Sequence, residues 1–542
     1  MHPSEPDPIF LAPRRPRKGP GKLTRNDLRV TGNDQSGFDL LAVPTPTQRR
    51  AFELLGTPIP HTLKQPEPPT QKTVKPLVSR GFTRHTPRNY GLGASINLET
   101  GRSPVDRYVR SSEETMMVTS RERVESALCH RESDRVPLDL GATTISGITV
   151  SSLYQLRQAL HLDPPGTPVR VSEPFQMLGE VTQDLLDALG VDTARVSLPT
   201  NMFGFRNDDW KPWTTFDGTP VFVPGEFPTV PEPNGDLLMY AQCDRSAPPC
   251  ARMPKNGLYF DLIMRQEPID EARLDPADNV EEFGPIGPEA LQHLRLEVER
   301  LAPSGRALIG EFGGTGFGDA AYMPGPGLSH PRGVRDLTEW LMSYMTRPGY
   351  VEEVFERQCQ IGLDNLASVH AVLGDAITAV VITGTDFGAQ NGPFISPKTY
   401  CRLFQPFHAR LNDWVHTNTH WKTFIHSCGS IWRLLDDVAD AGFDALNPVQ
   451  TSATGMDPKA LKNRYGERLT FWGGGIDTQR VLPFGTPEEV RDMVRERMEI
   501  FGPGGGFVFN TVHNIQAGVP APNLVALFEA VDEYRSYPMV VA

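Results

Sequence analysis

The feature that most constrains the fold is a repeated alternation of short β-rich runs with helical stretches. It begins near Thr119 and continues for about 420 of the 542 residues. A strand followed by a helix, repeated about eight times, favours an α/β fold of the (β/α)8 TIM-barrel type, with an open doubly wound sheet as the alternative. The expected strands are Val136 to Leu140, Thr193 to Leu198, Ala307 to Gly310, Ala379 to Thr383, Thr423 to His426, Ala445 to Asn447, Leu469 to Trp472 and Gly506 to Phe509.

Several of the expected helices have recognisable starts. Thr119 and Glu122 form a capping box ahead of the first helix, and Thr486 with Glu489 forms another. Ser396 precedes a proline at the first helical position of a third helix. The apolar face of the first helix is marked by Val124, Ala127 and Leu128.

Two segments depart from the alternation. Residues 1–112 are rich in Pro, Arg, Thr and Gly and show no sustained apolar period, so we expect a disordered, basic N-terminal extension. A targeting peptide, or an upstream start codon ahead of Met116 or Met117, are the alternatives. Residues 203–260 are dense in Trp, Pro, Asp and Gly and contain strand-like pieces such as Thr219 to Val223. We expect a β-rich insertion or lid there, with a packed irregular excursion as the other interpretation.

Charge and cysteine usage exclude several classes of protein. The formal net charge is -13, and residues 1–112 carry 18 Lys and Arg against 9 Asp and Glu, which leaves an acidic remainder. Such a remainder argues against nucleic acid binding through a broad basic surface. The six cysteines show no repeated spacing, and no apolar run is long enough for a membrane helix. We therefore expect a soluble protein of the reducing cytoplasm.

Polar side chains follow the expected strands. Barrel enzymes build their sites from the loops after the strands, so these side chains should converge on one mouth. They include Glu311, Asp386, Gln390, His426, Cys428, Asn447, Gln450, Asp477, His513 and Asn514.

The His-x-Cys pair at 426 and 428 is the most specific element. Residues two apart on an extended segment point the same way, so His426 and Cys428 can share one metal ion, and their chemistry suggests zinc. The run from Ser430 to Leu435 reads as a helix, which would put the thiol near a helix N-terminus and favour the thiolate. His513 and Glu311 are the natural further ligands. The alternative is a histidine and a thiol that are simply hydrogen-bonded in the mouth.

Asp386 and Asp477 each follow a strand within a glycine-containing turn. There a carboxylate can reach substrate or orient an imidazole. It can equally stabilise the turn by bonding its own backbone.

Six motifs in this order make the chain similar to a known family, the uroporphyrinogen decarboxylase superfamily. They are Asp134-Arg135-Val136-Pro137, Gly384-Thr385-Asp386-Phe387-Gly388, His426-Ser427-Cys428-Gly429-Ser430, Asn447-Pro448-Val449-Gln450, Gly475-Ile476-Asp477-Thr478-Gln479 and Val512-His513-Asn514-Ile515-Gln516. The resemblance covers roughly residues 119–536, which we predict to be one barrel domain.

The resemblance implies one of two activities. Uroporphyrinogen decarboxylases use no cofactor and carry an Arg-Gln-Ala-Gly-Arg segment early in the barrel, where this chain has Gly141-Ala142-Thr143-Thr144-Ile145-Ser146. The other branch consists of zinc-dependent methyltransferases that work with methylcobalamin and a thiol such as coenzyme M. Its His-x-Cys zinc pair maps onto His426 and Cys428. Its third ligand is commonly a cysteine near the last strand, where this chain offers His513.

The resemblance thus favours a corrinoid-dependent methyltransferase over a carboxy-lyase. In that function His426, Cys428, His513 and Glu311 are the expected zinc ligands, Asp386, Asp477 and Gln450 the catalytic, substrate-facing groups, and Gln390, Asn447 and Asn514 the cofactor-binding groups. The chain has no Asp-x-His-x-x-Gly motif, so the corrinoid would arrive on a separate protein. The alternatives are a cofactor-free decarboxylase that uses Asp386 or Asp477, and a non-catalytic barrel that binds a small molecule.

Overall fold

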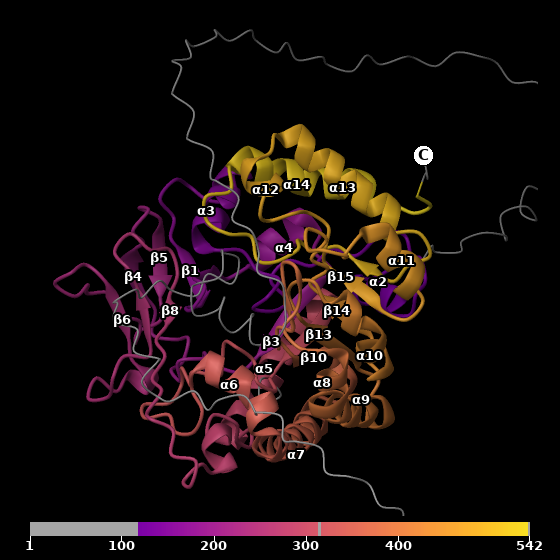
Figure 1. The fold of residues 1–542 in the computed structure, drawn as a ribbon. Helices are drawn as coiled ribbons and strands as arrows, with labels where there is room; N and C mark the ends of the chain where they lie inside the picture. Colours follow the sequence, from indigo (N-terminus) through magenta and orange to yellow (C-terminus); the bar gives the residue numbers. More distant parts are fainter. Residues whose placement is uncertain (1–117, 313–315, 540–542) are drawn as a thin grey trace, which may run out of the picture. The chain divides into compact units, whose positions relative to one another are not determined.

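Seven parallel strands form the central sheet of the computed structural model, which describes residues 118–312 and 316–539 (Figure 1). All described residues belong to the larger of the chain's two units, Asp39–Ala542, so the prediction for residues 1–112 lies outside them. The sheet has the order β16-β15-β14-β13-β10-β9-β3. Its strands are β3 (Thr193–Ser197), β9 (Ala307–Glu311), β10 (Ile377–Thr383), β13 (Lys422–His426), β14 (Ala445–Asn447), β15 (Thr470–Trp472) and β16 (Phe507–Val508).

The remaining expected strand, Val136 to Leu140, closes the sheet into a barrel. The segment around Leu138 is not a continuous strand, but it forms a parallel bridge with Phe509. On its other side, the Asp192 amide donates to the Leu138 carbonyl at 2.8 Å. The segment therefore joins the two ends of the sheet, which are β16 and β3. This closure confirms the (β/α)8-barrel and excludes the open sheet.

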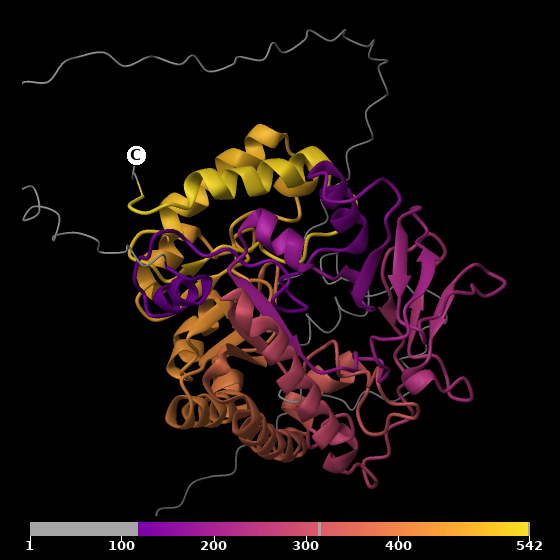
Figure 2. The same cartoon turned by 180° about the vertical axis from the view of Figure 1, so that it is seen from behind.

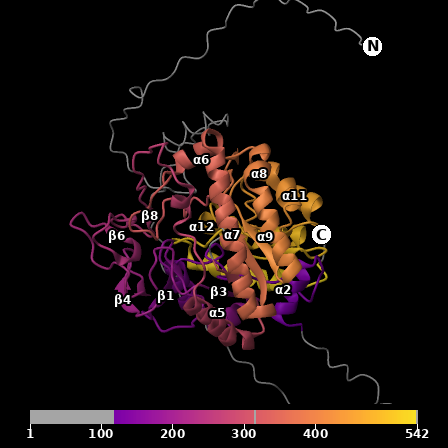
Figure 3. The ribbon, with the colours of Figure 1, turned by 90° about the horizontal axis from the view of Figure 1, so that it is seen from below.

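Helices follow the strands, and their starts confirm the capping predictions. Side chains of Thr119, Ser396 and Thr486 accept the expected backbone bonds, with capping boxes at the first and last. Figure 3 shows α7 and α9 side by side along the barrel. The helices are α2 (Ser120–Leu128), α3 (Val150–Ala159), α4 (Gln183–Leu189), α5 (Pro288–Leu301), α6 (Leu337–Thr346), α7 (Pro348–Leu373), α8 (Pro397–Leu403), α9 (Gln405–Asn418), α10 (Leu435–Asp440), α11 (Pro458–Tyr465), α12 (Val481–Phe484), α13 (Pro487–Phe501) and α14 (Ala521–Tyr534).

The apolar core inside the barrel lies toward the amino ends of the strands. The predicted face of α2 (Val124, Ala127, Leu128) packs against inward-facing residues such as Ile309 and Trp472. These side chains are almost fully buried. The opposite, carboxyl end of the barrel is left for polar groups.

The β-rich insertion is confirmed. Together with β1 and β2 it forms two small sheets, of order β2-β1-β5-β4 and β6-β7-β8. Figures 1 and 2 show these strands, in purple to magenta, gathered beside the barrel. The strands are β1 (Val169–Glu173), β2 (Leu178–Gly179), β4 (Lys211–Thr214), β5 (Pro220–Val223), β6 (Leu237–Met239), β7 (Ala251–Met253) and β8 (Asp261–Leu262), and a separate hairpin pairs β11 (Gly388–Ala389) with β12 (Gly392–Pro393).

Within the described residues, none of the helices has both the length and the apolar character that a membrane span requires.

Candidate metal centre

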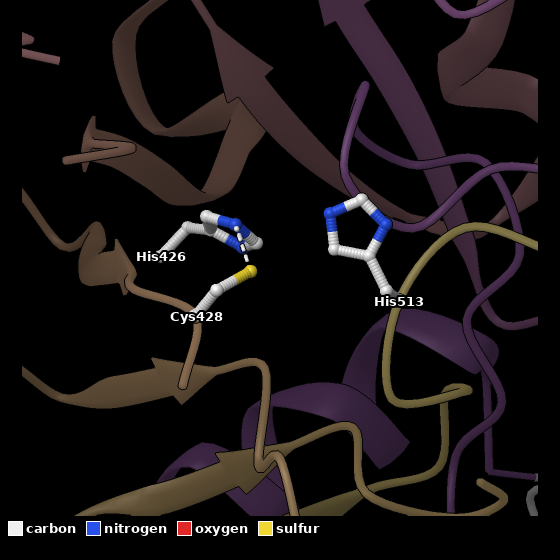
Figure 4. Close-up of side chains that lie close together, drawn as sticks. All are labelled: His426, Cys428 and His513. Atoms are coloured by element: carbon white, nitrogen blue, oxygen red, sulfur yellow. Dashed lines mark hydrogen bonds between the residues drawn. The ribbon is translucent and has the colours of Figure 1, made fainter. Parts of the chain in front are cut away.

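Three side chains of metal-binding type meet at the carboxyl end of the barrel. His426 ends β13, Cys428 lies two residues later, and His513 lies in the loop after β16. One potential ligand atom from each lies within 4.8 Å of the other two. Figure 4 shows the thiol of Cys428 beside the ring of His426, with the ring of His513 facing both. The predicted pair and one of its two predicted partners are thus brought together.

The turn after His426 depends on a glycine. Gly429 has a φ of 84°, and a Cβ at this position would collide with the carbonyl group of Gly388. The same contact lets the Ser430 amide donate to the Ala389 carbonyl at 2.8 Å. The β11–β12 hairpin therefore packs directly on the backbone that carries Cys428.

Both histidines of the cluster are held neutral. Burial lowers the pKa of His426 to about 4, although its bond with Asn447 acts in the opposite direction. Burial and the neighbouring His426 lower the pKa of His513 to about 4. The Nδ1 atom of His513 is buried and has no hydrogen-bond partner among the described residues. Neutral imidazoles have the lone pair that a metal ion requires.

The thiol differs from its prediction. Only a short 3-10 turn, Trp432–Leu434, precedes α10, so Cys428 does not lie at the N-terminus of an α-helix. Burial, followed by the nearby Asp386, raises the pKa of the Cys428 thiol well above its usual range. The expectation of a helix-stabilised thiolate is therefore wrong. In the absence of a cation, this environment favours the protonated thiol.

Two predicted catalytic residues support the loop of Cys428. The Cys428 amide donates to Asp386 Oδ1 at 2.7 Å, and the Gly429 amide donates to Gln450 Oε1 at 2.7 Å. Asp386 Oδ1 also lies 3.7 Å from His426 Nε2. Burial raises the pKa of Asp386 above its usual value, although the bond from the Cys428 amide acts in the opposite direction.

Glu311 is not brought into the cluster. Its carboxylate accepts bonds from the backbone amide and the hydroxyl of Thr144. It also pairs with Arg195 Nε at 2.8 Å. Thr144 and Arg195 therefore engage its oxygens in this structure, and its role as a metal ligand stays a prediction.

The remaining predicted residues make internal hydrogen bonds. Asn447 contacts His426, Gln390 donates to the Ser452 carbonyl, and Asn514 bonds Gly147, Thr144 and Gln176. Asp477 accepts bonds from the amides of Gln479 and Arg480. These bonds are the ones expected if Asp477 stabilises its own turn.

Sequence reasoning missed Asp319 and Tyr322. Burial raises the pKa of Asp319 to about 7, and Asp386 adds to this effect. Desolvation by the surrounding chain raises the pKa of Tyr322 although the residue is 39% exposed, and Asp319 and Glu311 add to this effect. Both residues lie well beyond the end of β9, in a stretch with no motif, so spacing offered no signal for them.

The donor set fits a divalent zinc ion. Two neutral nitrogens and one sulfur are ligands that zinc accepts, and three protein ligands are typical of catalytic rather than structural zinc sites. The buried, unpartnered Nδ1 of His513 also marks a group whose hydrogen-bonding needs the described residues do not meet.

A (β/α)8-barrel with such a cluster at the carboxyl ends of its strands belongs to a class of protein in which this end carries the working site. The family model for uroporphyrinogen decarboxylase (URO-D) matches residues 257–534, just over half of the chain. The chain therefore belongs to the uroporphyrinogen decarboxylase family. The matched region contains the whole metal-type cluster.

Among curated relatives, a uroporphyrinogen decarboxylase from Methylococcus capsulatus is 32% identical over 287 residues, which cover 51% of this chain and 75% of that protein. One from Shewanella loihica is 23% identical over 291 residues, which cover 51% and 73% of the two chains. A solved structure, a methyltransferase from Methanosarcina mazei, aligns with a TM-score of 0.42 and 14% identity, covering 77% of this chain and 99% of that structure.

Proposed function

We propose that this protein is a zinc-dependent methyltransferase that moves a methyl group between a corrinoid and a thiol or methylated substrate. The observation that carries the proposal is the approach of His426, Cys428 and His513 to within 4.8 Å of one another. A cofactor-free decarboxylase needs no such set of soft ligands.

In this proposal the three clustered side chains hold the zinc ion. When bound, zinc supplies a Lewis acid that lowers the pKa of a thiol. Burial keeps the two imidazoles neutral and available as ligands. Asp386 holds the backbone of Cys428 in place, since its carboxylate accepts the Cys428 amide.

The ligand set also gives the proposed site a particular charge. With one thiolate and two neutral nitrogens, a divalent ion keeps one net positive charge. A site with two thiolates would be neutral. The nitrogen of His513 therefore supports a stronger Lewis acid, because less negative charge is donated to the metal.

The corrinoid in this proposal is carried by a separate protein, and the compartment is the reducing cytoplasm. All six cysteines are free, which supports a reducing environment.

A second candidate is cofactor-free decarboxylation of uroporphyrinogen or a related compound. The names of the curated relatives favour it. Asp386 is then the acid to test, because Asp477 is engaged in its own turn. Against it, the segment from Gly141 to Ser146 has no arginine to pair with the carboxylates of such a substrate.

The test compares metal content in the full-length wild type, Cys428→Ser and Cys129→Ser after dialysis against a mild chelator. Cys129 is exposed and lies outside the cluster, so it is the matched control. We expect about one zinc per chain in the wild type and the control, and a loss in Cys428→Ser. The same proteins are then mixed with methylcobalamin and a thiol, and loss of the cobalt-bound methyl group is followed by absorbance.

Zinc that persists in Cys428→Ser, or demethylation that survives its loss, contradicts the proposal. Release of carbon dioxide from uroporphyrinogen in metal-free protein supports the decarboxylase instead. Binding of these compounds without turnover, unchanged in Cys428→Ser, supports a non-catalytic barrel.

A further inference from the structure

We propose that Asn447 is a positioning residue that fixes the ring of His426 with its proton on Nδ1 and its free nitrogen, Nε2, toward the metal centre. This inference rests on the proposed function, because it assigns a role in binding the same metal ion.

The first step is the orientation of the Asn447 amide. Asn447 ends β14 and is fully buried. Its Nδ2 donates to the Trp472 carbonyl of the neighbouring strand β15 at 2.8 Å. A carbonyl oxygen can only accept, so the nitrogen of the amide must lie on that side. The oxygen, Oδ1, is therefore the atom that faces His426.

The second step assigns the proton of the imidazole. His426 Nδ1 lies 2.6 Å from Asn447 Oδ1. Because an amide oxygen cannot donate, the nitrogen that contacts it must carry the hydrogen. A neutral imidazole has one N–H, so Nε2 has the free lone pair. This nitrogen lies 3.4 Å from the sulfur of Cys428.

The third step is the register that brings these groups together. His426 and Asn447 are directly paired partners on the adjacent parallel strands β13 and β14. The Ser427 amide also donates to the Asn447 carbonyl at 2.7 Å. The ring is therefore held by a rigid strand rather than a loop, and its orientation does not depend on a bound ion.

His513 provides an internal contrast. Its Nδ1 has no hydrogen-bond partner among the described residues, so no comparable contact orients its ring. The geometry of the metal centre then depends mainly on the contact that orients the ring of His426. A partner that accepts from a ligating histidine typically contributes about 10-fold to 100-fold to metal affinity.

The experiment uses three variants of the full-length chain: Asn447→Leu, Asn447→Asp and, as the matched control, Asn412→Leu. Asn412 is also a fully buried asparagine, which donates to the Ala441 carbonyl at 2.7 Å. Zinc affinity is measured by competition with a chromophoric chelator. The tautomer of His426 is measured in zinc-free protein by nitrogen NMR with 15N-labelled histidine, assigned by the loss of its signals in His426→Gln.

We expect Asn447→Leu to lose the Nδ1–H signature and to bind zinc about 10-fold to 100-fold more weakly. Asn447→Asp keeps an acceptor for the Nδ1 proton but loses the donor to Trp472. It should retain the tautomer and bind zinc at least about ten times more tightly than Asn447→Leu. If Asn447 had a purely structural role, Asn447→Asp should bind zinc more weakly than Asn447→Leu. The reason is that the introduced carboxylate would lie against the Trp472 carbonyl and disturb the fold. Asn412→Leu should lower the melting temperature without changing zinc affinity.

Equal zinc affinity in the wild type and Asn447→Leu overturns the inference, and so does a wild-type ring with its proton on Nε2. A wild type that has the expected tautomer but binds no zinc overturns the proposed function, whereas the orientation of the His426 ring stands. The NMR measurement needs no metal, so the two failures are distinguishable.

Discussion

The two ends of the barrel differ in how completely particular buried polar groups are paired. At the amino end, Asp192 is fully buried and accepts bonds from Arg123, Arg135, the Ser120 hydroxyl and the Leu138 amide. At the carboxyl end, His513 Nδ1 has no partner among the described residues, and Asp386 and Cys428 have raised pKa values. Paired groups serve stability, whereas incompletely paired groups are left available for a ligand.

The largest expected effect comes from breaking the amino end. Asp192→Ala leaves the buried Arg123 without one of its carboxylates, and we expect a loss of roughly 3–5 kcal/mol in the free energy of unfolding. Zinc content of the folded protein should not change. The control is Asp440→Ala, which removes a partner of Arg468 that is 61% exposed and should cost at most about 1 kcal/mol. Denaturant titration measures the free energy of unfolding of both variants. Equal losses in the two would contradict a special role of Asp192 in stability.

An effect of intermediate size concerns the response to pH. Burial and Asp386 raise the pKa of Asp319 to about 7, from 3.8 in the unfolded chain. Between these values the folded chain holds a proton that the unfolded chain releases, so the wild type loses stability as the pH rises. Asp319→Asn should therefore be more stable than wild type at pH 8 by about 1–3 kcal/mol, with chelator present. The difference should vanish below about pH 4.

The amino end should respond to acid with the opposite sign. Burial alone would raise the pKa of Asp134, but its bonds with Arg123 lower it to about 2. Its contribution is present above pH 3.8 and is lost as the pH falls from 3.8 to about 2. Asp134 is 47% exposed, so we expect about 1 kcal/mol or less from Asp134→Asn. Denaturant titrations of both variants at several pH values measure how the free energy of unfolding changes with pH. The same direction of change for Asp319 and Asp134 would contradict the contrast between the two ends.

The smallest expected effect on stability is the most informative about the cluster. His513→Ala removes a group that makes no hydrogen bond through Nδ1, so with chelator present the free energy of unfolding should change by less than about 1 kcal/mol. Zinc should nevertheless be lost. Glu311→Gln should retain zinc, because Arg195 and Thr144 already hold that carboxylate. Metal analysis decides between them, and loss of zinc in Glu311→Gln alone would reverse our assignment of ligands.

Much of the fold could be predicted from local patterns. The strand and helix alternation, the capping residues Thr119, Ser396 and Thr486, and the β-rich insertion all follow from propensities within short windows of sequence. The segment around Leu138 is the least regular of the expected strands, because it forms an isolated bridge with Phe509 and one backbone bond with Asp192 instead of a continuous ladder. Local patterns predict an element but do not measure how far its ladder extends.

The sequence by itself determined that His426 and Cys428 share one face of a strand end, because that follows from a spacing of two. Only the tertiary structure decided which distant residues complete the cluster. It brings His513 to His426 and Cys428, whereas the Glu311 carboxylate pairs with Arg195 on the adjacent strand. It also raised the pKa of Cys428, which local sequence had suggested would be lowered. Burial and cross-strand partners decide these properties, and both arise from residues far apart along the chain.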